Sequence, residues 1–185
     1  MRYLIISGSS GQNNLCASIQ QEVVRGAADG GAEVELLALD GIGRCKACNE
    51  GLGICRNEHR CAFGKDGFDD ARETANLADA LCIVTPVVWG EITELVKNFL
   101  ERMRRCDYGV IGALAGKPML IIAAPEGTGN GLLVCLEQMD RFCRHTGSVI
   151  FDFIGVYRWN NDYQKLSAYH AAKSMAYGRR AGEVI

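Results

Sequence analysis

Two kinds of hydrophobic pattern alternate along the chain. Apolar runs of strand length occur at 3–6, 34–39, 80–85, 119–124 and 149–156. Segments in which apolar residues recur every three or four positions, as on one face of a helix, occur at 15–27, 68–77, 92–103, 132–143 and 162–177. This alternation is typical of a parallel sheet with helices on both faces.

The composition of the runs indicates the order of the strands. The first, third and fourth runs are almost wholly apolar, as expected of central parallel strands. Glu33 and Glu35 flank Val34 in the second run, and Asp152 interrupts the fifth, so these two fit the sheet edges. We therefore predict an α/β, flavodoxin-like three-layer sandwich, with a five-stranded parallel sheet of order 2-1-3-4-5. The dinucleotide-binding order would place the third strand outside its neighbours.

Length and charge narrow the class of protein. The 185 residues fit a single domain, 1–185, in which a cysteine-rich segment, 43–66, is inserted after the second strand. The formal net charge of −2 gives no electrostatic reason to expect a nucleic-acid partner. The N-terminal apolar run is too short for a secretory signal, and no run approaches the length of a membrane span. We therefore expect a cytoplasmic protein without a membrane partner.

Three loops should lie at the carboxyl edge of this sheet, where open α/β sheets bind their ligands. The first, SGSSGQNN at 7–14, consists of small and polar residues and leads into a helix that begins near Leu15. Backbone amides and a helix N-terminus together suit a phosphate monoester. The loop is neither a Walker motif nor G-x-G-x-x-G. An ordinary Gly/Ser turn is the alternative.

The second and third loops suit a flat ring. The stretch TPVVWGE at 85–91 combines apolar side chains with backbone amides, and APEGTGNG at 124–131 has three glycines that allow close backbone approach. Each also has an unremarkable alternative. Trp89 would cap the core of the helix that it precedes, and the glycine-rich loop would be mobile and bind nothing.

Taken together, SGSSGQNN, ADALCIVTPVVWGEITELVKNFLERMRRCD and APEGTGNG, with CKAC after the second run, resemble the NADPH-dependent FMN reductase group of flavodoxin-like proteins, which includes the iron–sulfur flavoproteins. The resemblance implies an FMN-dependent NAD(P)H oxidoreductase that passes electrons to a flavin, a quinone or another small acceptor. The flavin would carry the chemistry, so no catalytic side chain is expected. The resemblance also implies a homodimer or homotetramer.

The resemblance assigns the cofactor-binding residues. It implies that the FMN phosphate is bound by Ser7, Ser9, Gly11, Asn13, Asn14 and the amide of Leu15. It implies that the isoalloxazine ring lies against Pro86, Val87, Val88, Trp89 and Gly90, with a loop over one side that contains Pro125, Glu126, Gly127, Gly129 and Gly131. The chain departs from the family in two places. The first loop lacks the Pro-Arg that often follows its first serine, and Val88 stands where a tyrosine is usual.

Four of the nine cysteines lie close together, with the spacing C-x2-C-x6-C-x5-C. They are Cys45, Cys48, Cys55 and Cys61. Four thiolates in one short loop fit a [4Fe-4S] cluster or tetrahedral zinc. The six-residue gap is wider than in the compact pattern of iron–sulfur flavoproteins, so unmetallated thiols and a dithiol switch also remain open. We expect this segment beside the flavin loops, where a cluster would exchange electrons with FMN.

Two other functions fit the same sequence. One is an iron–sulfur flavoprotein that carries electrons between redox protein partners without turning over NAD(P)H. The other is a zinc-stapled interaction module without flavin. The remaining cysteines fit core packing; they are Cys16, Cys82, Cys106, Cys135 and Cys143.

Overall fold

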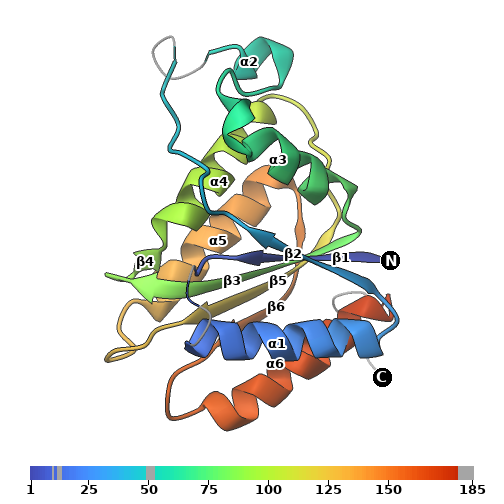
Figure 1. The fold of residues 1–185 in the computed structure, drawn as a ribbon, viewed down its shortest axis with the longest axis vertical. Coiled ribbons are helices and arrows are strands. Elements are labelled where there is room, and N and C mark those ends of the chain that lie inside the picture. Colours follow the sequence, from blue (N-terminus) through green and yellow to red (C-terminus); the bar gives the residue numbers. More distant parts are fainter. Residues whose placement is uncertain (10, 12–13, 49–52, 179–185) are drawn as a thin grey trace.

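A parallel sheet forms the middle layer of the computed structural model, which describes residues 1–9, 11, 14–48 and 53–178 (Figure 1). Its strand order is β2-β1-β3-β5-β6, which confirms the predicted order 2-1-3-4-5. The strands are β1 (Arg2–Ser7), β2 (Glu33–Ala38), β3 (Ala80–Val88), β5 (Pro118–Ala124) and β6 (Val149–Gly155). The acidic runs are the two edge strands, as their composition predicts.

A sixth, two-residue strand was not predicted. β4 (Glu91–Ile92) pairs antiparallel with the end of β3, placing Val87 opposite Ile92. Trp89 and Gly90 form the turn, with φ of 52° and 82°. A two-residue turn with positive φ at both positions matches the right-handed twist of a hairpin. The chain after β3 is therefore a projecting hairpin and not an irregular loop.

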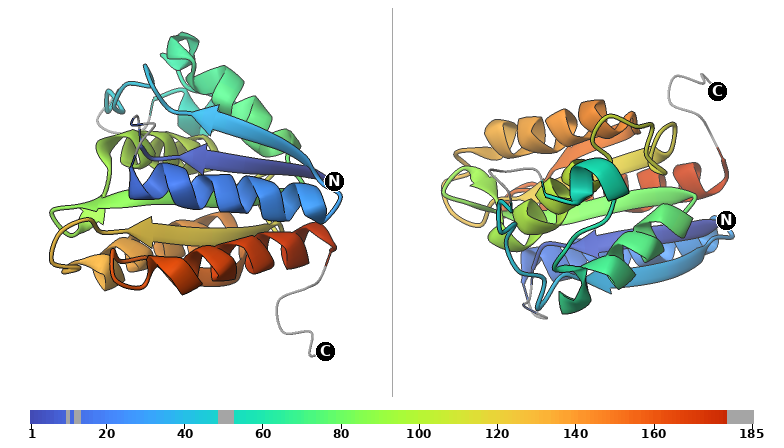
Figure 2. Two further views of the ribbon diagram at one scale, coloured as in Figure 1. Left: turned by 60° about the horizontal axis from the view of Figure 1, so that its bottom comes forward. Right: turned by 90° about the horizontal axis from the view of Figure 1, so that it is seen from above.

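Helices cover both faces of the sheet (Figures 1 and 2). On one face lie α1 (Leu15–Asp29) and α6 (Asn161–Ala176). On the other lie α3 (Phe68–Leu77), α4 (Glu94–Cys106) and α5 (Leu132–Thr146). α1 and α6 pack closely at Gly26, where a Cβ would lie 2.2 Å from the Tyr169 carbonyl oxygen.

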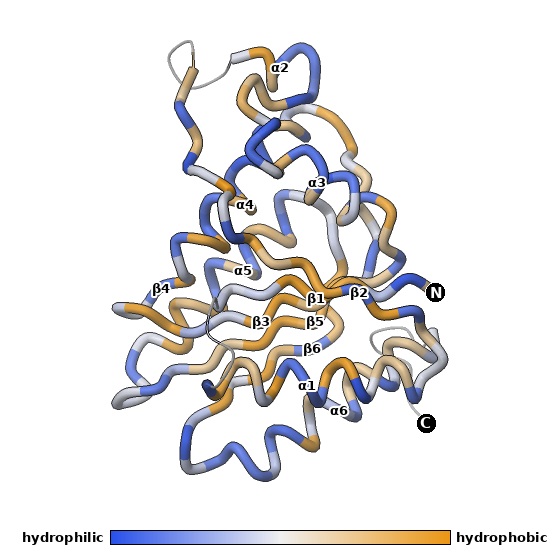
Figure 3. The backbone as a smooth tube through the Cα atoms, in the orientation of Figure 1, coloured by the Kyte–Doolittle hydropathy of each residue, from blue (hydrophilic) through white to orange (hydrophobic). Residues whose placement is uncertain are grey.

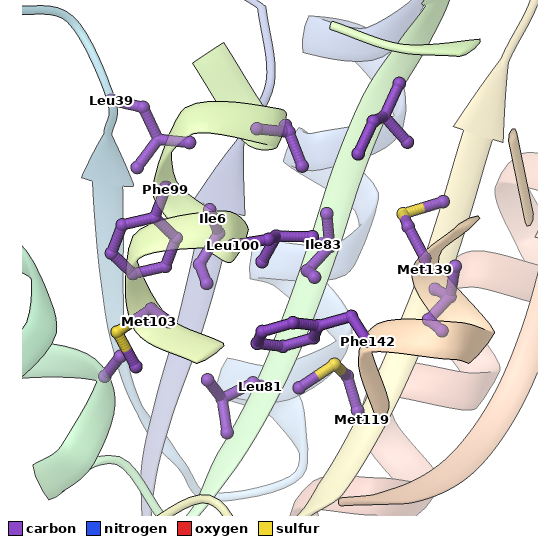
Figure 4. Packing of buried hydrophobic residues seen from close by; sticks show 14 of the residues in the cluster. Ile6, Leu39, Leu81, Ile83, Phe99, Leu100, Met103, Met119, Met139 and Phe142 are labelled. Atoms are coloured by element: carbon purple, nitrogen blue, oxygen red, sulfur yellow. The ribbon is translucent and has the colours of Figure 1, made fainter. Parts of the chain in front are cut away.

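Side chains of the central strands are buried on both faces, which explains why their sequences do not alternate. In β1, Leu4 and Ile6 join the core beneath α3, α4 and α5, whereas Tyr3 and Ile5 join the core against α1 and α6. Figure 4 shows Phe99 of α4 among the residues packed in the first core. Figure 3 shows the same central strands as the most continuous hydrophobic stretch of the chain.

The edge strand β6 carries an irregularity at the position of Asp152. Met119 of β5 pairs with Ile150, and Leu120 pairs with Asp152, so Phe151 is an extra residue in the ladder. Such a bulge is common on edge strands and locally disrupts pairing.

The cysteine-rich segment between β2 and α3 contains α2 (Cys55–Glu58) and the short 3-10 helix η2 (Gly64–Asp66). It leaves β2 at the carboxyl edge, but α2 lies outside the helical layer, over the C-terminal end of α4 (Figure 1). The 13 residues of α4 rise by about 20 Å. Within one chain, the segment therefore lies towards the opposite end of α4 from the β3–β4 hairpin that precedes this helix. Contacts with the last turns of α4 hold it there.

Within the ranges given above, no helix has both the length and the apolar character needed to cross a membrane.

Candidate functional site

The loop after β1 folds back on the N-terminus of α1. The Asn14 side-chain oxygen accepts the Ala17 amide at 2.9 Å and caps the helix. The Asn14 amide nitrogen donates to Ser9 Oγ at 2.7 Å, and Ser9 Oγ also accepts the Gly11 amide at 3.3 Å. The first turn of α1 contains no acidic residue. The resulting helix end favours an anion.

Gly8 joins this loop to the start of α4. Its amide donates to the Val84 carbonyl at 2.8 Å, and its carbonyl accepts Thr93 Oγ1 at 2.9 Å. A Cβ on Gly8 would lie 2.6 Å from Val96 and 2.7 Å from Thr85. The close approach of these elements therefore requires glycine, and it fixes the phosphate loop relative to the hairpin that follows β3.

A hollow of about 500 Å³ lies between the β3–β4 hairpin and the loop after β5. This ring hollow is lined by Val87, Trp89, Gly90, Pro125, Gly127, Thr128, Gly129, Asn130 and Gly131. Its volume falls within the usual range for cofactor sites. Trp89 is 99% exposed, so the alternative that it caps the core of the following helix is wrong.

Glycines let the walls of the ring hollow come together. Gly131 has φ of 85°, and a Cβ there would lie 2.2 Å from the Gly90 Cα. Gly129 has φ of 82° and packs against Tyr157, whose ring stacks on that of Trp159 at a centroid distance of 4.7 Å. Sequence reasoning missed both aromatic residues. The sequence did offer one indication of their role, because both directly follow the last strand and therefore lie at the carboxyl edge of the sheet.

A second hollow, of about 430 Å³, opens beside the phosphate loop. This phosphate hollow is lined by Asn14, Leu15, Ser18, Glu126, Arg158 and Asn161. Arg158 was also missed by sequence reasoning, because it follows β6 and lies far from the phosphate loop in the sequence. A guanidinium at this position favours a bound phosphate, whereas the Glu126 carboxylate opposes one.

The structure brings most of the expected flavin residues to these two hollows. Those in the ring hollow are Val87, Trp89, Gly90, Pro125, Gly127, Gly129 and Gly131. Asn14, Leu15 and Glu126 line the phosphate hollow. Ser7 is the last residue of β1, and Ser9 and Gly11 lie in the loop that leads to α1. Pro86 and Val88 line neither hollow, and Asn13 lies outside the described residues.

The four clustered cysteines converge on a third hollow, here called the thiol pocket. It is lined by Cys45, Cys48, Cys55 and Cys61, by Arg102, Arg105 and Cys106 of α4, and by neighbouring parts of the segment, Arg44, Lys46, Gly53, Ile54, Ala62 and Phe63. Its volume of about 20 Å³ is close to the room that one water molecule needs. In the part of the chain that the structure describes, no three His, Cys, Asp or Glu side chains are arranged to hold a metal ion. Four cysteines lining one pocket are nevertheless the residue types that would hold a thiolate-bound group.

The other cysteines are buried in the core, and all nine are free thiols. Burial raises the pKa of four of them to about 12, namely Cys16, Cys106, Cys135 and Cys143. Burial also raises the pKa of Cys82 well above its ordinary value. These thiols remain protonated at physiological pH and are therefore poor nucleophiles. Of these five buried cysteines, Cys106 differs in its location, because it is the last residue of α4 and lines the thiol pocket.

A family comparison decides between the classes of protein that this fold permits. The model of the family described as NADPH-dependent FMN reductase matches residues 1–155. The chain belongs to this family. The matched range contains β1 to β6 and therefore the phosphate loop, the ring hollow and the thiol pocket, but not Arg158 or Trp159.

Curated relatives of this FMN reductase family member include two archaeal proteins. An iron–sulfur flavoprotein of Archaeoglobus fulgidus is 33% identical over 115 residues, which cover 59% of this chain and 52% of the relative. An iron–sulfur flavoprotein of Methanocaldococcus jannaschii is 24% identical over 144 residues, covering 77% of this chain and 71% of the relative. The match thus spans about half the length of the Archaeoglobus protein.

Among solved structures, an NAD(P)H:quinone oxidoreductase from Methanothermobacter marburgensis has a TM-score of 0.73 with this chain. The two are 14% identical, and the match covers 97% of this chain and 99% of the other. At this identity the likeness concerns the fold, which is flavodoxin-like.

Proposed function

We propose that this chain is an FMN-dependent NAD(P)H oxidoreductase that reduces a quinone, a flavin or another small acceptor. One observation carries the proposal: among the residues that the structure describes, no titratable side chain lines the ring hollow. A reaction in that hollow therefore needs a bound group that brings its own chemistry. Membership of the NADPH-dependent FMN reductase family supports FMN as that group.

The chain's residues would bind and orient FMN, and the flavin, when bound, would supply hydride and electron transfer. Ser9, Asn14 and the N-terminus of α1 would hold the phosphate, with Arg158 adding positive charge. The β3–β4 hairpin and the glycine-rich loop would shield the ring from water, and Trp89 would stand at the rim. With a quinone acceptor, NAD(P)H, a proton and quinone give NAD(P)⁺ and hydroquinone, so two electrons and two protons reach the acceptor.

Turnover separates the enzyme from an electron carrier. FMN-loaded protein is mixed with NADPH or NADH and a soluble quinone, and oxidation of the nicotinamide is followed by absorbance. We expect multiple turnovers that depend on FMN. Absence of turnover with either nicotinamide, together with rapid reduction of the flavin by a reduced redox protein, would support the carrier and contradict the enzyme.

We further propose that the thiol pocket holds a [4Fe-4S] cluster bound by Cys45, Cys48, Cys55 and Cys61. The iron–sulfur flavoprotein relatives and the convergence of these thiols on one hollow support this assignment. Three guanidiniums, those of Arg44, Arg102 and Arg105, line the same pocket and offset the negative charge of thiolate ligands. Iron and acid-labile sulfide in anaerobically purified protein test it. One zinc per chain, or four free thiols with no metal, contradicts it.

We also propose that the protein is a homo-oligomer. Trp89 and Leu133 are 99% and 79% exposed. Trp89 lines the ring hollow, and Leu133 lies in the first turn of α5, two residues after Gly131, which also lines it. Large apolar side chains exposed around a site commonly mark an interface. Light scattering during size-exclusion chromatography measures the mass, and a strictly monomeric protein contradicts this proposal.

A further inference from the structure

Arg102 ties together the two ends of the cysteine-rich segment. It lies on α4, and only 2% of its surface is exposed. One terminal nitrogen donates to the Gly43 carbonyl at 3.0 Å and to the Asp66 carboxylate at 2.7 Å. The other donates to the second Asp66 oxygen at 3.0 Å, to the Phe63 carbonyl at 3.0 Å and to Cys61 Sγ at 3.4 Å. We call these five residues the Arg102 clasp.

The clasp crosses the whole segment, because Gly43 precedes all four clustered cysteines and Asp66 follows them. The Gly43 amide also donates to the Asp66 carboxylate at 3.0 Å, which closes the loop directly. The guanidinium carbon lies 4.2 Å from the centre of the buried Phe68 ring at the start of α3. A bidentate, charge-assisted ion pair of this kind is strong and directional.

The stability of the hydrophobic core does not by itself require a buried arginine at position 102. A buried guanidinium loses its hydration, and apolar residues in its place are often as stable. The guanidinium makes contacts that an apolar side chain cannot make. It donates hydrogen bonds to two backbone carbonyls and one carboxylate of the cysteine segment, and also to the sulfur of Cys61. The geometry thus points to the thiol pocket as the feature that Arg102 serves.

We propose that Arg102 is the positioning residue of the thiol pocket: it holds both ends of the cysteine segment on α4, and its hydrogen bond to Cys61 raises the reduction potential of the bound cluster. The proposal rests on the cluster proposed above. Hydrogen bonds to ligand sulfurs are among the factors that set cluster potentials. A positive donor stabilises the more negative, reduced state of the cluster, so its loss lowers the potential.

The test compares four variants of the full chain, purified anaerobically. Arg102→Met removes the clasp, Arg102→Lys keeps the charge without the fork, and Asp66→Asn weakens the clasp without changing α4. Arg104→Met is the matched control, because Arg104 is exposed on the same helix and does not line the thiol pocket. FMN affinity reports whether each variant has folded.

Iron content and the midpoint potential of the cluster are then measured. We expect a severalfold loss of iron in Arg102→Met and Asp66→Asn, partial retention in Arg102→Lys, and a lower potential in the Arg102→Met clusters that remain. The control should match the wild type in both. Full iron content with an unchanged potential in folded Arg102→Met protein overturns the proposal.

Amide hydrogen exchange on metal-free protein tests the clasp independently of the cluster. If the wild type binds no iron, the cluster proposal and its potential fall, and exchange decides whether the clasp orders the segment. Slow exchange in 43–48 and 61–66 that becomes fast in both Arg102 variants supports the positioning role. Equal exchange in wild type and variants overturns it.

Discussion

Gly131 stands so close to Gly90 that a Cβ on Gly131 would lie 2.2 Å from the Gly90 Cα. This contact joins the two loops that form the ring hollow, and both glycines have positive φ, 85° and 82°. Any side chain at position 131 must therefore push the loops apart and also adopt a left-handed backbone conformation. The width of the ring hollow depends on this pair.

Gly131→Ala should weaken FMN binding by about 5- to 150-fold, because the left-handed conformation and the clash together cost about 1–3 kcal/mol. Titration of apoprotein with FMN, followed by quenching of flavin fluorescence, measures the effect. Gly109→Ala is the matched control, since Gly109 also has a positive φ, a Cβ there meets nothing within 4 Å, and it does not line the ring hollow, so the affinity should be almost unchanged. Equal affinities in the two variants would show that the ring binds elsewhere.

Asn14→Ala should separate phosphate binding from ring binding. It removes both the cap on α1 and the hydrogen bond to Ser9. We expect a loss of about 1 kcal/mol in the free energy of unfolding, together with weaker binding of FMN. Riboflavin, which lacks the phosphate, should bind the variant and the wild type equally. A parallel loss of affinity for both flavins contradicts the assignment of this loop to the phosphate.

Thiol counting tests the division of the cysteines into two groups. In reduced, metal-free, native protein at pH 8, a chromogenic disulfide reagent should react rapidly with Cys45, Cys48, Cys55 and Cys61 alone. The other five are buried and have raised pKa values, so they should react only after denaturation. Rapid reaction of a fifth thiol would indicate that Cys106 is accessible from the thiol pocket.

Asp66 makes the clasp sensitive to acid. Burial alone would raise the pKa of this carboxyl, but hydrogen bonds from Arg102 and from the Gly43 amide outweigh it and lower the pKa. A lowered pKa in the folded state means that the stabilisation is complete above the ordinary carboxyl pKa near 4. It is lost as the pH falls through the lower, folded-state value.

The difference in urea midpoint between wild type and Asp66→Asn should therefore be largest near pH 6 and shrink towards pH 2. Asp70→Asn, at an exposed neighbouring position on α3, serves as the control for removing one negative charge. A difference that is constant across this range would show that Asp66 contributes no charge-dependent stability.

Strand order was predictable because burial leaves a compositional signal. Glu33 and Asp152 fit only strands at the edges of the sheet, and this was enough to choose the flavodoxin-like strand order over the dinucleotide-binding one. The β4 strand was not predictable, because Trp89-Gly90 form a hairpin turn without the Asn-Gly or Asp-Gly pair that usually marks one.

The sites show a similar contrast. Residues in the loops after β1, β3 and β5 were predicted, but the loop after β6 carries no local motif. It brings Arg158 to the phosphate hollow, and Tyr157 and Trp159 against Gly129. The buried position of Arg102, by contrast, could have been predicted from the sequence of α4. This arginine lies three residues after Phe99 and four before Cys106, so it falls on the buried face of α4, where an arginine needs partners.

The central claim is that the ring hollow binds FMN and that NAD(P)H reduces it there. Apoprotein is loaded with FMN, freed of unbound flavin, and mixed anaerobically with NADPH and, separately, with NADH while the visible flavin absorbance is recorded. We predict one FMN per chain and rapid bleaching with at least one nicotinamide in the wild type, and much less bleaching in Gly131→Ala. Protein that retains no FMN, or bound FMN that neither nicotinamide bleaches, would contradict it.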